Sequence, residues 1–416
     1  MKPYKKIKCC RICKSKKIVE VIDLKSQYIQ GSFIKKGYPN PYIKKIPLQL
    51  VLCKDCFLIQ TICTVNKKIL YKNYWYSSGI NNTMRSHLKQ LVFEVTNFFK
   101  KSKNINVLDI GCNDGTLLNF FPKNINCYGI DPSQITNKIK NKNINKFNDF
   151  FPPKKKISKS FKSKFSIITS IAMFYDIDDP NKFVKEIKSS LKKDGIWIFE
   201  LSYLLDMLKL NSFDTICHEH LEYYSIQTLN YLMFSHNLKI FKISRNNING
   251  GSIRCFVTHR NNNKYDNKLD LLNLKKQVAL EKKLKINNFK IYKKFYKNIL
   301  LIKKQLKDLI FKIKEKGQSI YILGASTKGN TILQFLELKN NEIKFAVERN
   351  RQKVGAKIIG SNIKIISEKQ ALRQKPDYYL VLPWHFKSEI IRREKKYLKS
   401  GGKLLFPLPK VQIIKN

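Results

Sequence analysis

The stretch INVLDIGCNDGT, residues 105–116, constrains the fold of this chain more than any other. An apolar strand ends at Leu108, a tight polar turn follows, and an apolar helical pattern begins at Leu117. A strand, a glycine-bearing turn and a helix place backbone N–H groups at the carboxyl end of a parallel sheet, where such folds bind ligands. The sequence therefore predicts an α/β domain with a ligand site at this turn.

The turn has the spacing Asp-x-Gly-x-x-x-Gly, with carboxylates at Asp109 and Asp114. A dinucleotide fingerprint carries three glycines at a different spacing, and carboxylates would repel its pyrophosphate. They suit a cationic ligand that carries an amino acid group, as S-adenosylmethionine does. A second acid, Asp131, ends the next apolar stretch about 20 residues later, where an acid commonly holds ribose hydroxyls.

The turn resembles motif I of the class I methyltransferases, which implies S-adenosylmethionine as cofactor. An ordinary strand–helix unit is the alternative for either acid-bearing piece taken alone. The residues expected to bind the cofactor lie in this turn, at the tips of the second and fourth strands, and in a Ser-Gly run upstream: Asp109, Gly111, Asn113, Asp114, Asp131, Ala172 and Ser78.

The formal net charge of +51 would suit nucleic acid or an anionic membrane. Lysine, asparagine and isoleucine are frequent in every part of the chain, whereas arginine, which base and phosphate readers favour, is sparse. This pattern is typical of solvated faces under a codon bias toward A and T. No nucleic-acid partner is therefore expected, and an anionic small substrate such as a nucleotide remains compatible with the charge.

The length of 416 residues suits two or three domains. No apolar run follows the basic N-terminus, and no stretch is apolar enough to cross a bilayer. A cytoplasmic protein without a membrane partner is expected, so the 10 cysteines should be thiols or metal ligands.

Two C-x2-C pairs lie near the N-terminus, Cys10 with Cys13 and Cys53 with Cys56. This spacing is that of a tetrahedral four-thiolate zinc site in which each pair forms a tight knuckle. The pairs are far apart, so residues 25–47 must loop out. A closed four-cysteine site leaves no open coordination position, and the zinc is expected to be structural. Two spare cysteines lie nearby, of which the first can compete with Cys10 as a ligand: Cys9 and Cys63.

Between the cysteines and the turn lies a cluster of aromatic residues, 74–79, which serves either as core or as a cover over the cofactor. A helix is expected from there to about Lys101. Further along, strands at 165–172 and 195–201 flank a helix at 181–193, and the lysine-rich residues 152–164 read as an exposed loop. Alternating strands and helices predict a doubly wound parallel sheet.

The segment His218-Glu219-His220 carries three titratable groups side by side. The spacing does not fit the His-Glu-x-x-His helix of zinc proteases. In an extended segment the two histidines would share one face, and histidine is the group best suited to proton transfer near neutral pH. A chance cluster is the alternative. We expect general acid–base work from this segment.

Residues from about 266 to 316 show steps of three and four between apolar positions, which predicts helix packed on its neighbours. Residues 318–416 read as a separate α/β domain. Its first turn, 324–331, places Lys328 and hydroxyls at a helix N-terminus, which suits either a phosphate cradle or a plain structural turn.

Taken in order, these pieces resemble a family of three-domain sugar C-methyltransferases over essentially the whole chain. The implied fold is α/β, a Rossmann-like class I methyltransferase sheet flanked by a small zinc-binding domain and a C-terminal Rossmann-like domain. The motifs that carry the resemblance are the four cysteines, the YWYSSG run at 74–79, the turn at 109–115, the Glu-His pair and the GASTKGNT turn at 324–331. The implied division is a zinc-binding domain at 1–70, a methyltransferase domain at 71–260, a helical linker at 261–317 and a C-terminal domain at 318–416.

The resemblance implies methylation of a carbon in a nucleotide-linked keto-sugar. Carbon becomes nucleophilic only after it loses a proton, which a neighbouring ketone permits by forming an enolate. The resemblance assigns proton transfer to Glu219 and His220, and it places Tyr76, or Tyr74, near the reacting centre.

This chain departs from the family at two positions, Tyr175-Asp176 at the tip of the fourth strand and His218. The sugar is therefore expected to differ from those best known for the family, and His218 to share the acid–base work. An O- or N-methyltransferase acting on a small molecule stays open, because such an enzyme needs only one base. A nucleic-acid methyltransferase or binding protein is suggested by charge alone.

Overall fold

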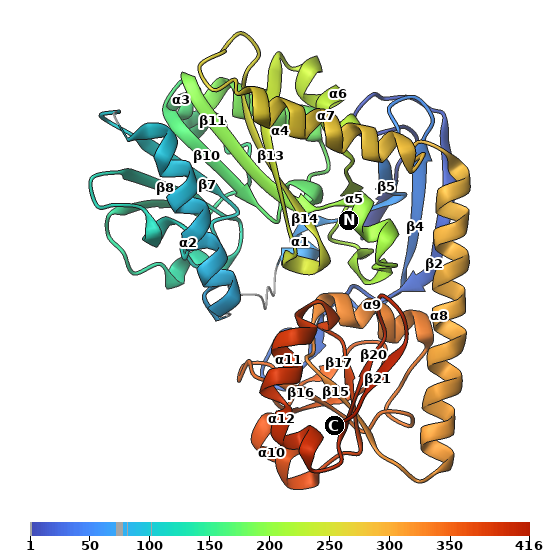
Figure 1. Cartoon of the computed structure of the whole chain (residues 1–416). Coiled ribbons are helices and arrows are strands. Elements are labelled where there is room, and N and C mark those ends of the chain that lie inside the picture. The colour runs from blue at the N-terminus through green and yellow to red at the C-terminus, as the bar shows by residue number, and fades with distance from the viewer. Residues whose placement is uncertain (1, 72–77, 81, 101) are drawn as a thin grey trace.

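The computed structural model describes residues 2–71, 78–80, 82–100 and 102–416 (Figure 1). The strands of the N-terminal segment pair in antiparallel fashion. Strand β1 pairs with β6, while β2, β4 and β5 form a sheet with β12 (Glu222–Tyr223) in the order β12-β5-β4-β2. The elements of this segment are β1 (Tyr4–Lys6), β2 (Ile18–Gln27), β3 (Phe33–Ile34), β4 (Ile46–Cys53), β5 (Ile59–Thr61), β6 (Cys63–Val65) and α1 (Lys67–Tyr71).

The central sheet has seven strands in the order β13-β14-β11-β10-β7-β8-β9. Strands β7 to β11 are parallel, and β14 runs antiparallel between β11 and β13. The prediction of a doubly wound α/β fold is confirmed. The strands are β7 (Asn106–Ile110), β8 (Asn126–Ile130), β9 (Ile144–Phe147), β10 (Phe165–Ile171), β11 (Leu191–Ser202), β13 (Leu238–Asn246) and β14 (Ser252–His259).

The strand order reverses between β7 and β10, because the chain leaves β7 toward β8 and later returns on the other side. Ligands of open α/β sheets bind in the crevice at such a point. The flanking elements are η1 (Ser78–Ile80), α2 (Asn82–Thr96), η2 (Asn97–Phe99), η3 (Leu118–Phe120), η4 (Gln134–Lys138), α3 (Lys155–Phe161), η5 (Phe174–Asp176), α4 (Pro180–Ser190), α5 (Leu204–Lys209), η6 (Phe213–Thr215), β12 (Glu222–Tyr223), α6 (Ile226–Ser235) and η7 (Ile248–Gly250).

Two local predictions for this domain were wrong. The lysine-rich residues 152–164 are not a loop, because α3 forms there and buries Phe161 against Phe147 and Phe165. One apolar anchor is enough to fix the helix while its lysines stay in water. The motif turn is followed by the single 3₁₀ turn η3 rather than a long helix.

The predicted helical region beyond the central sheet is confirmed as two helices, α7 (Lys268–Lys283) and α8 (Phe289–Glu315). They meet at Lys285, whose φ of 53° ends the first helix, and the Asn288 side chain caps the second. Helix α8 runs alongside β2 to the C-terminal sheet (Figure 1), and Tyr296 Oη donates to the Asp23 carbonyl at 2.7 Å. The buried positions of α8 recur at steps of three and four: Tyr292, Phe295, Ile299, Ile302, Leu306, Ile310 and Ile313.

The C-terminal sheet has the order β21-β20-β19-β15-β16-β18-β17-β3. Its last strand comes from the N-terminal segment, so residues 25–47 do not simply loop out. The backbone N–H of Tyr28 donates to Gln334 Oε1 at 2.7 Å, and the backbone carbonyl of Tyr28 accepts from Gln334 Nε2 at 3.1 Å. The elements are β15 (Ile320–Leu323), α9 (Thr327–Leu336), β16 (Phe345–Glu348), β17 (Lys357–Ile358), β18 (Lys364–Ser367), α10 (Glu368–Gln374), β19 (Tyr378–Val381), η8 (Trp384–Phe386), α11 (Lys387–Arg393), α12 (Lys395–Lys399), β20 (Lys403–Phe406) and β21 (Gln412–Ile414).

Within the described ranges, every helix is too short or too polar to span a lipid bilayer.

Candidate active site

A cavity of about 440 Å³ lies where the first four parallel strands of the central sheet end. All three parts of the chain contribute to its walls. The central sheet supplies the turn after β7 and the tips of β8, β9 and β10, while the N-terminal segment supplies residues 29–33 and the end of α1. The C-terminal domain closes it with the start of α9 and with η8.

The turn after β7 builds one end of this cavity. Gly111 has a φ of +75°, and a Cβ there would lie 3.0 Å from Met173, so only glycine fits the turn without strain. Asp109 is buried and accepts from Thr169 Oγ1 at 2.6 Å. Burial raises the pKa of Asp109 to about 7, and a cationic ligand would restore its ionised form.

Asp131 is held rigidly at the tip of β8. One carboxylate oxygen accepts from Asn113 N at 3.1 Å, and the other from Ser133 N at 2.8 Å and Ser133 Oγ at 2.5 Å. The motif turn therefore orients Asp131, which lines the cavity. This is the placement that a ribose-binding acid needs.

The expected cofactor residues divide into two groups. Ser78, Asp109, Gly111, Asn113, Asp131 and Ala172 line the cavity. Asp114 does not, because its carboxylate accepts from Gly79 N at 2.9 Å and from Thr116 N and Oγ1 at 3.2 and 2.6 Å. With Asn113, which accepts from Ser78 N at 3.0 Å, it holds η1 over the turn. The structure thus makes Asp114 a support of the site.

Two positions of the cavity wall illustrate what the sequence reasoning missed. Asp149 and Phe150 follow β9 and line the cofactor end beside Asp131. An acid just after the third strand of the sheet, as after the first two, was the signal that could have identified them.

Glu219 and His220 both line the cavity. His220 Nδ1 lies 2.7 Å from the Thr215 carbonyl, which can only accept, so Nδ1 carries the proton. Burial, reinforced by Lys328, lowers the pKa of His220 to about 3. The imidazole is therefore neutral at physiological pH, and its Nε2 carries a free lone pair.

Tyr175 fixes the position of this segment. Its ring lies against that of His220 with centroids 4.3 Å apart, and its carbonyl accepts from Leu221 N at 2.8 Å. The tip of β10 thus packs against the segment that carries His220 and Leu221. Tyr76 and Tyr74, expected near the reacting centre, lie outside the described residues.

His218 does not reach the cavity, in contrast to the expectation that it would share a face with His220. The chain bends at 218 and 219, so the two side chains diverge. His218 is buried, with Nδ1 2.8 Å from Gln30 Oε1 and Nε2 3.1 Å from the Ile46 carbonyl. Burial lowers its pKa to about 4. His218 therefore joins the segment that carries Glu219 and His220 to the N-terminal segment, and its role in the structure is to support this segment.

The C-terminal wall of the cavity carries cations. Lys328 Nζ donates to the Asn249 carbonyl at 2.6 Å, and Lys353 Nζ to the Ala325 carbonyl at 2.9 Å. Burial lowers the pKa of both lysines. The carboxyl of Asp214 partly offsets this shift at Lys328, and the carboxyl of Glu348 does so at Lys353. His385 lines the same wall. The turn at 324–331 therefore places Lys328 in the wall of the cavity.

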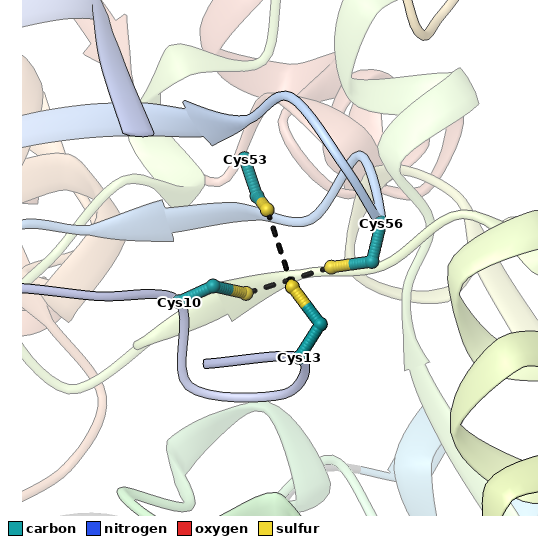
Figure 2. Close-up of side chains that lie close together, drawn as sticks. All are labelled: Cys10, Cys13, Cys53 and Cys56. Atoms are coloured by element: carbon teal, nitrogen blue, oxygen red, sulfur yellow. Dashed lines mark hydrogen bonds between the residues drawn. The ribbon is translucent and has the colours of Figure 1, made fainter. Parts of the chain in front are cut away.

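The four predicted zinc ligands come together (Figure 2). Their sulfur atoms all lie within 4.8 Å of one another, with Sγ–Sγ distances of 3.5 Å between Cys10 and Cys56 and 3.4 Å between Cys13 and Cys53. Tetrahedral thiolates about 2.3 Å from zinc are about 3.8 Å apart, so the cluster fits Zn²⁺. It is separate from the cavity, as a structural zinc site should be.

This fold and this site define a methyltransferase that uses S-adenosylmethionine. Three family models match in sequence, a zinc binding domain over residues 10–71, a methyltransferase domain over 84–243 and a C-methyltransferase C-terminal domain over 247–409. The chain belongs to this three-domain family of S-adenosylmethionine-dependent C-methyltransferases, with a structural zinc site.

One curated relative spans nearly the whole chain. It is the C-methyltransferase NovU of Streptomyces niveus, 26% identical over 97% of this chain and 96% of its own length. A tRNA U34 carboxymethyltransferase of Campylobacter curvus is 35% identical over 24% of this chain and 35% of its own. A solved S-adenosylmethionine-dependent methyltransferase of Clostridium acetobutylicum is 14% identical, covers 42% of this chain and 92% of its own, and has a TM-score of 0.33.

Proposed function

We propose that this protein methylates a carbon beside the ketone of a nucleotide-linked keto-sugar, and that His220 and Glu219 handle the proton. One observation carries the proposal. A single cavity has an acidic end at Asp109 and Asp131, a basic wall at Lys328, and the neutral base His220 in the same lining.

The charges that line the cavity are complementary to those of the two proposed ligands. Carboxylates at the motif turn and at the tip of β8 favour the cationic sulfonium and the ribose of S-adenosylmethionine. Lys328 and Lys353 favour an anionic group such as the diphosphate of a nucleotide-linked sugar. The sugar would then lie against the Glu219–His220 pair.

The proton chemistry follows from the tautomer of His220. Its Nε2 takes the proton from the carbon beside the ketone, and the electron pair moves to the ketone oxygen. The Thr215 carbonyl stabilises the imidazolium that forms, because it accepts from Nδ1–H. Bound S-adenosylmethionine supplies a methyl group that its sulfonium already activates. Carbon attacks this methyl group and the ketone is restored.

The test uses the zinc-loaded protein with a nucleotide-linked 4-keto-6-deoxyhexose in D₂O, first with S-adenosylhomocysteine and then with S-adenosylmethionine. Exchange of a carbon-bound proton, followed by a gain of one methyl mass, is expected. His220→Gln and Glu219→Gln should each lower both rates while the cofactor affinity stays unchanged. His236→Gln, at the end of α6, is the matched control.

Methylation of a hydroxyl or amine without exchange at carbon would move the protein to the O- or N-methyltransferases. Exchange and methylation at unchanged rates in His220→Gln would overturn the assignment of the base.

A further inference from the structure

Asp176 ends the 3₁₀ turn η5 at the tip of β10, and it lines the cavity together with Glu219 and His220. Its backbone is fixed from two sides. Asp176 N donates to the Met173 carbonyl at 3.0 Å, next to the cofactor turn, and the preceding residue, Tyr175, accepts from Leu221 N. The backbone at Asp176 therefore has a set position between Met173, next to the motif turn, and Leu221, which follows His220.

One oxygen of the Asp176 carboxyl group makes no hydrogen bond with the part of the protein that the structure describes. This oxygen, Oδ1, is buried. A buried polar atom without a partner is costly and needs an explanation, and a catalytic role is one such explanation. The orphaned oxygen in the cavity wall points to a polar atom of the substrate.

The neighbours of Asp176 decide its protonation state. The titratable groups that face it are one cation, two carboxyls, two phenols and a thiol: Lys67, Glu219, Glu222, Tyr71, Tyr223 and Cys217. Burial first, and then Glu219 and Glu222, raise the pKa of Asp176 well above its usual range, and Lys67 only partly opposes them. The raised pKa favours the protonated form, a carboxylic acid whose O–H can donate a hydrogen bond.

We propose that Asp176, in its protonated form, donates a hydrogen bond to the ketone oxygen of the substrate and holds that oxygen when it becomes an enolate. The inference rests on the proposed function. It gives the site an electrophile to match the base, which carbon methylation needs and a simple O-methyl transfer does not.

The step balances without a further reactant. The C–H bond breaks, its proton goes to His220 Nε2, and its electron pair forms the C=C bond as the C=O pair moves onto oxygen. Asp176 keeps its proton throughout. When carbon bonds to the methyl group, the sulfonium leaves as a neutral thioether, the C=O bond re-forms, and His220 later releases its proton to water.

The protonation state can be measured without substrate. The infrared difference spectrum between the unmodified zinc-loaded protein and Asp176→Asn at pH 7.5 should contain the carbonyl stretch of one buried carboxylic acid, because the bands of other buried acids such as Glu222 cancel in the difference. A difference spectrum without that band would overturn the proposal.

Kinetics then tests the role. Asp176→Asn keeps a hydrogen-bond donor and should lose no more than about tenfold in the rate of proton exchange, whereas Asp176→Leu should lose about 10² to 10³-fold. In the unmodified protein the exchange rate should fall at high pH as Asp176 ionises, and Asp176→Asn should lack this fall. Asp176→Ser is a smaller replacement if the leucine variant does not fold.

The outcomes separate the two proposals. If the unmodified protein exchanges no carbon-bound proton of any keto-sugar, the proposed function fails and the role of Asp176 fails with it. If the unmodified protein exchanges but Asp176→Leu or Asp176→Ser exchanges equally fast, or if the high-pH fall persists in Asp176→Asn, only the role of Asp176 is overturned.

Discussion

The guanidinium Nε of Arg11 lies 3.5 Å from a carboxylate oxygen of Glu222, and the two side chains are 2% and 0% exposed. Arg11 stands between the first two zinc ligands, and Glu222 follows His220 by two residues. Other bonds join the same regions, since β12 pairs with β5 and Thr61 N donates to the Leu221 carbonyl at 2.9 Å. The zinc knuckle therefore supports the segment that carries Glu219 and His220 directly.

Arg11→Met should lower the free energy of unfolding by about 3 kcal/mol, because it leaves Glu222 buried without a cation. The value lies at the lower end of the range for broken buried pairs, since burial raises the pKa of Glu222 and lets the group take up a proton. The double variant Arg11→Met/Glu222→Leu should recover part of the loss in urea denaturation, because the hydrogen bonds from Arg11 to the Thr61 carbonyl and Thr64 Oγ1 stay lost. Additive effects of Arg11→Met and Glu222→Leu would contradict a coupling between the two residues.

Removal of zinc should lower the rate of proton exchange at the substrate carbon more than it lowers cofactor affinity. The reason is that β12, which follows His220, pairs with β5 in the sheet that carries Cys53. Asp109 and Asp131 instead lie in β7 and at the tip of β8, in the central sheet. Exchange by NMR and calorimetric cofactor binding, before and after chelation, give the comparison. Cys9→Ser should keep the zinc, and a chelated protein with unchanged exchange would show that the knuckle does not position the base.

The stability that three buried histidines contribute should fall as the pH drops from about 6.5 toward 4. Burial lowers the pKa of His218 to about 4 and of His220 and His385 to about 3, whereas an unfolded histidine has its ordinary value of about 6.5. At these histidines the unfolded state binds protons that the folded state does not, so each contributes about 1.4 kcal/mol per pH unit. The buried carboxyls Asp109 and Glu222, whose pKa values are raised, act in the opposite direction, so the test compares variants with the unmodified protein. His218→Gln should reduce the slope by one proton in urea denaturation at pH 4.5, 5.5 and 6.5. An unchanged slope would mean that His218 is not buried in its neutral form.

Asp131→Asn should weaken binding of S-adenosylmethionine by about 1.5–3 kcal/mol, the contribution of a hydrogen bond to a charged group. Isothermal titration calorimetry measures it. Asp194→Asn is the control, because Asp194 is an exposed acid paired with Lys264 at the opposite end of β11. Equal effects of the two variants would remove Asp131 from the cofactor site.

The features that could be predicted from the sequence are those whose chemistry depends on residues close together in the chain. The cysteine pairs, the motif turn and the acid at Asp131 each depend on a few adjacent residues, and the structure brings them to the expected places. The fold class followed from the alternation of strands and helices.

The parts that escaped prediction depend on contacts far apart in the chain. A bend of two residues separates His218 from His220, and no periodicity reveals it. Lys353 enters the cavity wall from the segment after β16, in a chain where lysine is frequent everywhere. Strand β3 has two residues and no pattern of its own, so only its partner β17 defines it.

Strand β3 also has a consequence for biosynthesis. It is made more than 300 residues before its partner, Lys357–Ile358. At about 10 residues per second the interval is roughly half a minute. During that time residues 29–33, which line the cavity, lie beside a strand that has no partner. This wall of the cavity therefore takes its place only after residues 357–358 have been made.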